Sequence, residues 1–188
     1  MPTVFLDRDG VINRKLPGDY VKSWQEFEFL PGAIEGLRML KQHGFRLIVV
    51  TNQRGVSLGR LRENDLCAIH ERMHRELRDA GAALNTLYYC PHDNNVCECR
   101  KPEIGLFLQA QRDFPDIRFE ESFVIGDSIG DMEAGARLHS KNVLIGEDTE
   151  EILAGLAAKN LLVDFSAPSL LDAVGEYLIH SKGIGISI

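Results

Sequence analysis

Polar residues able to bind a metal ion and a phosphate group follow four short apolar runs of this sequence. The four groups are DRDG at 7–10, TNQ at 51–53, RKP at 100–102 and GDS at 126–128. Each group alone would be explained by turn formation, because Asp, Asn, Thr and Gly are common in loops. Carboxylates brought together repel one another unless a cation lies between them, and Mg²⁺ prefers oxygen ligands. Since lysine pairs with phosphate oxygens, the four groups together indicate a magnesium and phosphate site.

A second group of possible ligands lies in the stretch CPHDNNVCEC. Three thiolates and one imidazole make a complete tetrahedral ligand set for zinc, and here they would come from Cys90, His92, Cys97 and Cys99. A disulfide within this set is the alternative, but in a reducing cytoplasm clustered cysteines indicate metal ligands first. Zinc without an open coordination position would be structural. It would fix a loop that has too little apolar content to pack on its own. The fixed loop would then present Arg100 and Lys101 to a phosphate group.

Apolar runs and helical periodicity alternate along the chain and predict the elements that position these groups. Strands are expected at 3–6, 45–50, 86–89, 123–125, 142–145 and 161–163. Helices are expected at 31–44, 66–80, 104–114, 130–138 and 168–181. Asp148 and Glu151 would form a capping box at the start of a further helix. Residues 11–30 follow no regular pattern, and we interpret them as a flap.

This alternation of apolar strands and helices is typical of the α/β class, with a Rossmann-like parallel sheet and helices on both faces. Ligands of such sheets bind beyond the carboxyl ends of the strands, where the four polar groups are expected. Neither a repeat nor a linker divides the chain, so residues 1–188 are expected to form a single domain. Its irregular parts would be the flap at about 11–30 and a zinc-binding loop at 90–102.

Composition and charge disfavour several classes of protein. The formal net charge of −7 argues against a nucleic-acid binder, which usually has a basic face. No apolar run approaches the roughly 18 residues of a membrane span, and the N-terminus MPTVFLDRDG is not built like a signal peptide. We therefore expect a cytoplasmic monomer that binds a small phosphorylated molecule, and neither nucleic acid nor a membrane.

The stretches DRDGVIN, VVTNQ, RKP and VIGDSIGD resemble the four motifs of the haloacid dehalogenase-type phosphatases. The resemblance implies a Mg²⁺-dependent phosphomonoester hydrolase that acts through an aspartyl-phosphate intermediate. It implies that Asp7 is the nucleophile and that Asp9 is the general acid and base. Thr51 and Lys101 would bind the oxygens of the transferred phosphoryl group. Mg²⁺ would be held by Asp7, by Asp127 and by the backbone carbonyl of Asp9.

The arrangement C-x-H…C-x-C-R-K-P resembles the zinc loop of the D-glycero-D-manno-heptose 1,7-bisphosphate 7-phosphatases and of the histidinol-phosphate phosphatases. Both groups are small and lack a large cap domain. FEFLPGAIEGLRML, TNQRGVSLGRL and YYCPH favour the heptose enzymes, which act on the route to the activated heptose of the lipopolysaccharide core. A short zinc loop, a flap lengthened at 15–19 and Arg54 depart from the heptose pattern. The resemblance implies substrate contacts from Arg8, Asp19, Tyr20, Asn52, Gln53, Arg54, Arg100 and Ser128.

Several alternatives remain open at the level of sequence. Arg54 would reach the second phosphate of a bisphosphate or lie in solvent, and Asp131 would support the metal site or favour a helix start. Histidinol phosphate or another small phosphomonoester is the alternative substrate. A receiver-type signalling module also gathers Asp, Thr and Lys at strand ends, but the spacing of Asp7 and Asp9 favours turnover over storage. A zinc-knuckle nucleic-acid binder is disfavoured by the net charge.

Overall fold

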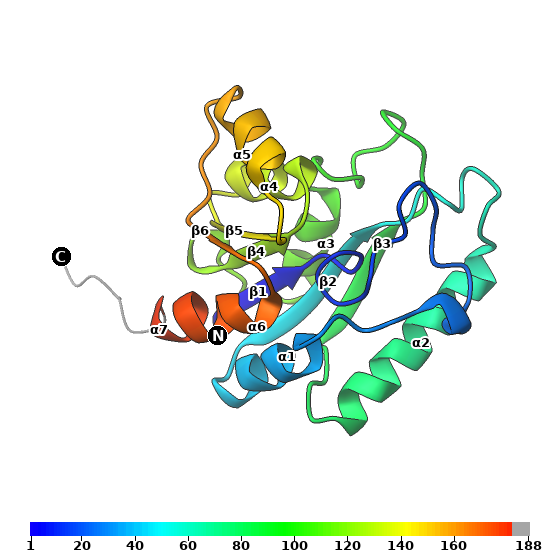
Figure 1. Ribbon diagram of the computed structural model, residues 1–188, viewed down its shortest axis with the longest axis horizontal. Helices are drawn as coiled ribbons and strands as arrows, with labels where there is room; N and C mark the ends of the chain where they lie inside the picture. Colours follow the sequence, from blue (N-terminus) through cyan, green and yellow to red (C-terminus); the bar gives the residue numbers. More distant parts are fainter. Residues whose placement is uncertain (182–188) are drawn as a thin grey trace.

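A six-stranded parallel sheet with the order β3-β2-β1-β4-β5-β6 forms the centre of the protein (Figure 1). The structure, a computed structural model, describes residues 1–181, and the tail at 183–188, expected to dock or fray, lies outside this part. The strands are β1 (Thr3–Leu6), β2 (Arg46–Asn52), β3 (Thr86–Cys90), β4 (Phe123–Gly126), β5 (Lys141–Ile145) and β6 (Phe165–Ala167). The chain runs from β1 outward to β3, then crosses back to β4 beside β1. Ligands of such sheets bind at this point of reversal.

Helices cover both faces of the sheet, which confirms the expected fold class. They are α1 (Ala33–Gln42), α2 (Glu63–Asp79), α3 (Gly105–Asp113), α4 (Ile129–Arg137), α5 (Glu150–Ala157), α6 (Leu170–Ala173) and α7 (Ile179–Ser181). A π-helical turn, η3 (Val174–Leu178), joins α6 to α7, and short 3₁₀ turns form at η1 (Trp24–Glu26) and η2 (Phe119–Glu121). Within the described residues, no helix is both long and apolar enough to cross a membrane.

Strand β1 is buried on both faces and holds the start of the first polar group in place. Val4 and Leu6 pack into the core that α1, α2 and α6 cover, whereas Phe5 packs into the core on the side of α3. The rings of Phe5 and Phe107 meet edge to face with their centroids 5.0 Å apart. Immediately after the strand, the backbone N–H of Asp7 donates to the carbonyl of Ile125 on β4 at 2.9 Å. This bond fixes Asp7 at the edge shared by β1 and β4.

The segment between β1 and α1 contains only η1 and crosses the carboxyl edge of the sheet. Its far part is anchored by aromatic side chains: Trp24 stacks on Phe27 with 4.7 Å between ring centroids, and Phe27 meets Phe29 edge to face. The guanidinium of Arg72 on α2 lies 4.8 Å over the Trp24 ring. With this part anchored, residues 15–20 lie across the ends of the strands.

Two details of the last third of the chain differ from the sequence-based prediction. The last strand is β6 and not residues 161–163, which form no strand. Leu161 and Val163 pack instead against a small core of Met132, Leu144 and Leu156, so packing between helices α4 and α5 explains their apolar character. The expected capping box is also absent, because helix α5 has Thr149 as its N-cap and no side chain caps it.

Candidate active site

A pocket of about 480 Å³ lies at the carboxyl ends of β1, β2 and β4. Acidic residues after β1 and β4 form its floor, and the flap and the segments after β2 and β3 form its walls. The flap meets the segment after β2 in two places. Arg60 Nη1 donates to the carbonyl of Gly18 at 3.3 Å, and Tyr20 packs on Gly55, where an added Cβ would lie 2.8 Å from the Tyr20 ring. These contacts hold the flap over the strand ends.

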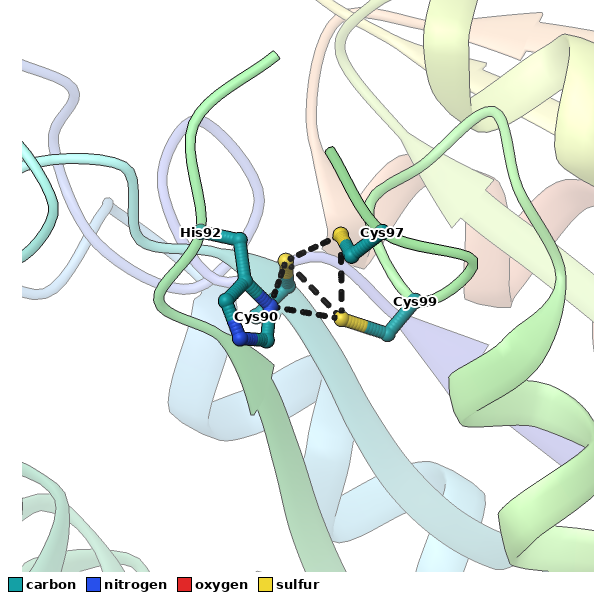
Figure 2. A group of neighbouring side chains, drawn as sticks. All are labelled: Cys90, His92, Cys97 and Cys99. Atoms are coloured by element: carbon teal, nitrogen blue, oxygen red, sulfur yellow. Dashed lines mark hydrogen bonds between the residues drawn. The ribbon is translucent and has the colours of Figure 1, made fainter. Parts of the chain in front are cut away.

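The wall after β3 is a loop in which the side chains of Cys90, His92, Cys97 and Cys99 converge (Figure 2). The three sulfur atoms lie 3.1 to 3.6 Å apart, and His92 Nδ1 lies 3.2 Å from Cys99 Sγ. Thiolates bound to one tetrahedral zinc would be separated by about 3.8 Å, since the Zn–S bond measures about 2.3 Å. The four ligand atoms therefore surround one point and could hold a metal ion. All four cysteines of the chain are free thiols, and Cys67 lies outside this group.

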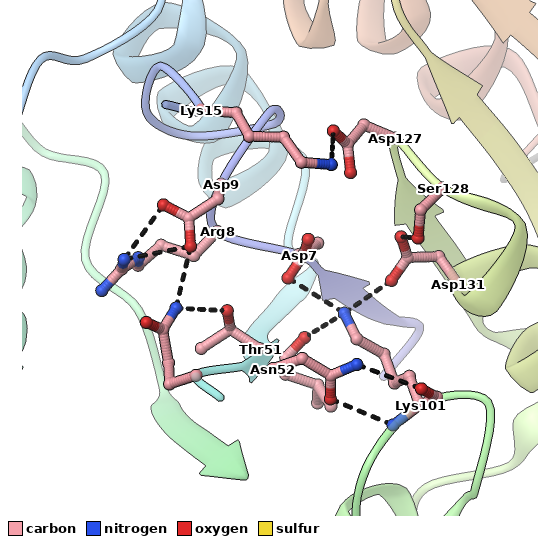
Figure 3. A network of polar contacts seen from close by, with 12 residues as sticks. Asp7, Arg8, Asp9, Lys15, Thr51, Asn52, Lys101, Asp127, Ser128 and Asp131 are labelled. Carbon is pink, nitrogen blue, oxygen red and sulfur yellow. Dashed lines mark hydrogen bonds and ion pairs between the residues drawn. The ribbon is translucent and has the colours of Figure 1, made fainter. Parts of the chain in front are cut away.

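Lys101, just after this loop, lies between two carboxylates at the floor of the pocket (Figure 3). Its Nζ is 2.9 Å from Asp7 Oδ1 and 2.5 Å from Asp131 Oδ1, and it donates to the Val50 carbonyl at 2.6 Å. Burial alone would lower the pKa of Lys101, but the two carboxylates raise it above its usual value. Its ammonium is therefore a fixed positive charge beside Asp7, suited to binding phosphoryl oxygens.

Three carboxylates of the floor, Asp7, Asp127 and Asp131, bring one oxygen each within 4.8 Å of the others. Asp127 receives the ammonium of Lys15 from the flap, with Nζ 2.7 Å from Oδ2, whereas its buried Oδ1 has no hydrogen-bond partner among the described residues. Gly10 makes room for this carboxylate, because an added Cβ would lie 2.2 Å from Asp127 Oδ2. Gly10 also has a φ of +92°, which favours glycine. A cluster of this kind, with an unpaired buried oxygen, fits a hard divalent cation.

The electrostatics of Asp7 agree with this fit. Burial, together with the carboxylates of Asp131, Asp127 and Asp9, raises the pKa of Asp7 to about 7, although Lys101 acts in the opposite direction. Burial also raises the pKa of Asp127, against the effect of Lys15. Both groups would become better ligands in the presence of a cation that lowers their pKa values.

Asp9 has a different environment, in which hydrogen-bond donors surround its carboxylate. Arg8 Nη2 lies 3.0 Å from both carboxylate oxygens, Asn13 Nδ2 donates to Oδ1 at 2.9 Å, and Gln53 Nε2 donates to Oδ2 at 2.8 Å. Burial alone would raise the pKa of Asp9, but Arg8 and these hydrogen bonds lower it below its usual value. Two neighbouring carboxylates thus differ in pKa, with Asp7 shifted upward and Asp9 downward.

Comparisons with known proteins agree with this site. The family model described as polynucleotide kinase 3 phosphatase matches residues 4–169. A D-glycero-alpha-D-manno-heptose-1,7-bisphosphate 7-phosphatase of Mycobacterium bovis is 44% identical over 184 residues, 96% of this chain and 93% of the relative. The chain belongs to the heptose-1,7-bisphosphate 7-phosphatase family. The expectation of a haloacid dehalogenase-type phosphatase is thereby confirmed.

Members of this heptose phosphatase family match the chain to different extents. A D-glycero-beta-D-manno-heptose-1,7-bisphosphate 7-phosphatase of Escherichia coli O6:H1 is 42% identical over 144 residues, 72% of this chain and 74% of the relative. Among solved structures, the D,D-heptose 1,7-bisphosphate phosphatase from B. bronchiseptica, complexed with magnesium and phosphate, has a TM-score of 0.83. The two sequences are 30% identical, and the match covers 93% of this chain and 97% of the chain in that structure.

Most of the residues predicted for a heptose phosphatase site line the pocket, namely Asp7, Asp9, Asp19, Tyr20, Asn52, Arg54, Arg100, Lys101, Asp127 and Ser128. Asn52, Arg54 and Ser128 have further partners, and Arg54 Nε lies 2.5 Å from Asp93 Oδ1. The side-chain amide of Asn52 pairs with the backbone of Lys101, at 3.0 and 3.1 Å, and so joins the end of the Cys/His loop to β2. Ser128 Oγ donates to Asp131 Oδ2 at 2.5 Å.

Three predicted residues, Arg8, Thr51 and Gln53, lie beneath the pocket with fully buried side chains. The sequence predicts substrate contacts for Arg8 and Gln53, but both side chains donate to Asp9 instead. In this structure both side chains therefore contact the neighbouring carboxylate. Thr51 Oγ1 accepts a hydrogen bond from Gln53 Nε2 at 3.0 Å.

Sequence reasoning missed at least four residues in or beside the site, namely Asn13, Lys15, Arg60 and His70, which contacts Arg8. Asn13 stands four residues after Asp9 within DRDGVIN, and this short spacing could have identified it. Lys15 lies in the part of the flap that departs from the family pattern, and nothing in its neighbours indicates a partner. His70 carries no signal either, since it occupies an apolar position of α2. Asp131 fits both positions that the sequence left open, because its carboxylate contacts Lys101 and it also lies in the first turn of α4.

Proposed function

We propose that the protein hydrolyses the 7-phosphate of D-glycero-D-manno-heptose 1,7-bisphosphate and prefers the α-anomer. The observation that carries this proposal is the pairing of Asp7 with Lys101, 2.9 Å apart on the floor of the pocket, in a member of this family. The α-anomer is favoured because the α-type relative aligns with 96% of the chain, against 72% for the β-type relative. The product would be used in the synthesis of an activated heptose. The enzyme would act as a monomer in the cytoplasm.

Asp7 would attack the phosphorus atom and become an aspartyl-phosphate, which divides one difficult displacement into two easier steps. Lys101 would bind phosphoryl oxygens as their charge is redistributed, and its contacts with Asp131 and Val50 hold it there. Because Thr51 Oγ1 already accepts from Gln53, its hydroxyl hydrogen is available for donation toward the same oxygens. Asp9 would first take up a proton from solvent, against the lowering of its pKa by Arg8, and then give it to the leaving alkoxide; it would later take a proton from the hydrolytic water.

A magnesium ion would be held by the carboxylates of Asp7 and Asp127 and by the backbone carbonyl of Asp9. The Asp9 carboxylate itself would stay outside this ligand set, because Arg8, Asn13 and Gln53 occupy its oxygens. The buried, unpaired Oδ1 of Asp127 supports the assignment. When bound, Mg²⁺ supplies positive charge that orients the phosphate and neutralises charge developing on it.

Zinc is the metal that we propose for Cys90, His92, Cys97 and Cys99, in a structural role. Its bonds would hold the loop in one shape and thereby set the position of Lys101. The loop end is close-packed against the next helix, because a Cβ added to Gly105 would lie 2.4 Å from the carbonyl of Glu98. Without metal, the three thiol groups, whose sulfur atoms lie 3.1 to 3.6 Å apart, would make only weak hydrogen bonds with one another.

The second phosphate of the substrate would be bound at the basic side of the pocket. Arg54, Arg60 and Arg100 line it there, beside the flap residues Asp19 and Tyr20. Arg100 supports this assignment because its Nη1 is buried and has no hydrogen-bond partner among the described residues. Arginine is suited to phosphate, since its planar guanidinium can donate two parallel hydrogen bonds.

Initial rates with purified protein in Mg²⁺ test this function. We expect kcat/KM for the α-anomer of the heptose bisphosphate to exceed that for histidinol phosphate by about a hundredfold or more. The β-anomer of the heptose bisphosphate is measured as the third substrate. Phosphorus NMR of the product should show that only the 7-phosphate is lost. Asp7→Asn is the control for contaminating phosphatase. Faster turnover of histidinol phosphate than of either heptose bisphosphate would reject the proposed substrate.

A further inference from the structure

A buried chain of contacts connects helix α2 with the carboxylate of Asp9. The side chain of His70 enters from α2, and its Nε2 lies 2.9 Å from Arg8 Nη1. The other terminal nitrogen of the same guanidinium, Nη2, lies 3.0 Å from both oxygens of Asp9. Arg8 is fully buried and His70 is 8% exposed, so water does not substitute for either partner. Neither the motif residues nor the relatives' names assign a role to this histidine.

The buried guanidinium of Arg8 needs the acceptor that His70 supplies. A guanidinium has five N–H donors, and leaving a buried donor unpaired is costly. Among the described residues, Arg8 Nε has no partner, and His70 and Asp9 receive the two terminal nitrogens. Burial, aided by the Arg8 cation, lowers the pKa of His70 to about 3. The imidazole is therefore neutral, and its Nε2 lone pair accepts the hydrogen bond from Arg8.

The position of Arg8 in turn determines the position of Asp9. A guanidinium is planar and rigid, so fixing Nη1 also fixes the direction of Nη2. Asn13 and Gln53 complete the set of donors to Asp9, each from one side. The carboxylate is thus held in one orientation at the wall of the pocket, which it lines.

We propose that His70 is a positioning residue for the reaction: it holds the Arg8 guanidinium in the plane that keeps the Asp9 carboxylate aimed into the pocket. The inference rests on the proposed role of Asp9 as the acid that protonates the leaving alkoxide. His70 touches neither the substrate nor the reacting atoms, and it acts only through Arg8. Loss of its acceptor would let the guanidinium rotate and take Asp9 out of line.

Two substitutions distinguish the effect of the hydrogen-bond acceptor of His70 from the effect of the packing of its ring. His70→Phe keeps a ring of similar size beside Tyr89, whose ring centroid is 5.5 Å away, but has no acceptor. His70→Gln loses the ring but can bring its amide oxygen near the place of Nε2. His74→Phe is the matched control, because His74 lies one turn further along the same helix and is only half-buried.

The ratio of kcat/KM between an alkyl and an aryl phosphate reports on the acid function of Asp9. An alkoxide must be protonated as it leaves, whereas p-nitrophenolate leaves without a proton. For His70→Phe we expect kcat/KM on the alkyl phosphate to fall by about 10- to 100-fold, with a much smaller fall on p-nitrophenyl phosphate. His70→Gln should recover most of the loss, and His74→Phe should match the wild type on both esters.

Equal losses on both esters, or full activity of His70→Phe, would overturn the proposal and leave His70 as a packing residue. The same holds if His70→Gln is impaired more than His70→Phe. Melting temperatures show whether each variant is folded; if His70→Phe is not, His70→Asn, whose amide is one methylene too short, takes its place. The ratio can be measured on any alkyl phosphate that the wild type hydrolyses. Failure with heptose bisphosphate would therefore reject the proposed function without deciding the role of His70.

Discussion

Replacing Lys15 by methionine should make the substrate-free protein bind Mg²⁺ more tightly. Lys15 reaches from the flap to Asp127, with Nζ 2.7 Å from Oδ2, and so occupies a carboxylate that we assign to the metal. A cation bound at the unpaired Oδ1 of Asp127 would lie beside this ammonium and weaken its pair with Oδ2, so the energy of the pair is subtracted from the binding energy of the metal. Methionine keeps the length and apolar character of the stem while removing the charge.

The size of this effect follows from the geometry of the pair. Two unit charges 2.7 Å apart attract with about 1.5 kcal/mol in water and about 6 kcal/mol at an effective dielectric constant of 20. Asp127 is 14% exposed, but the side chain of Lys15 is 55% exposed, so solvent screens most of the attraction. Pairs with such exposure contribute about 1 kcal/mol at most. We therefore expect about fivefold tighter binding of Mg²⁺, since 1.36 kcal/mol corresponds to tenfold.

Isothermal titration of Mg²⁺ into the substrate-free protein measures this change directly. The gain of Lys15→Met over the wild type should shrink at high ionic strength, because salt weakens the pair that is removed. Lys22→Met is the control, since Lys22 is another flap lysine but pairs with Asp19 at 2.5 Å, away from the acidic floor. Equal or weaker Mg²⁺ binding by Lys15→Met would refute the reasoning, and so would an equal gain in Lys22→Met.

Three further outcomes follow from the site. Gly10→Ala should weaken Mg²⁺ binding by more than about tenfold in the same titration, because its Cβ would lie 2.2 Å from Asp127 Oδ2 and its φ is strained; unchanged affinity would contradict this. Cys99→Ala should lose the bound zinc in metal analysis and lower the melting temperature by about 5 °C or more. The increase in melting temperature caused by Mg²⁺ should grow as the pH rises through about 7, the pKa of Asp7. Without metal, folded Asp7 holds its proton more tightly than unfolded Asp7 between pH 3.8 and about 7, so its contribution to stability falls over that range. Equal shifts at pH values well below and well above 7 would contradict the assignment of Asp7 as a ligand.

The parts of the site that could be predicted from sequence are those whose partners are close in the chain or lie at strand ends. The ligands of the Cys/His group are at most nine residues apart, so their spacing alone indicates that they converge. Asp7 and Asp127 each follow a buried strand by one residue, and a parallel sheet brings such positions together. Both predictions rest on local pattern and on one topological rule.

The parts that could not be predicted depend on contacts between distant segments. His70 and Arg8 are 62 residues apart, and the position of His70 on an apolar stripe is also what a core residue would show. Lys15 reaches Asp127 across 112 residues, along a flap whose path no periodicity defines. The missed strand β6 has a similar cause, because Leu161 and Val163 are more apolar than the true strand but pack under a helix.

One of the three cations of the site is exposed and the other two are buried. Four carboxylates, those of Asp7, Asp9, Asp127 and Asp131, face three cations, those of Arg8, Lys15 and Lys101. The side chains of Arg8 and Lys101 are 0% and 4% exposed, whereas that of Lys15 is 55% exposed. If a divalent ion replaced Lys15, its two charges and those of Arg8 and Lys101 would add up to four and would neutralise the four carboxylates. The released ammonium would then lie at the mouth of the pocket, where an arriving phosphate needs a cation.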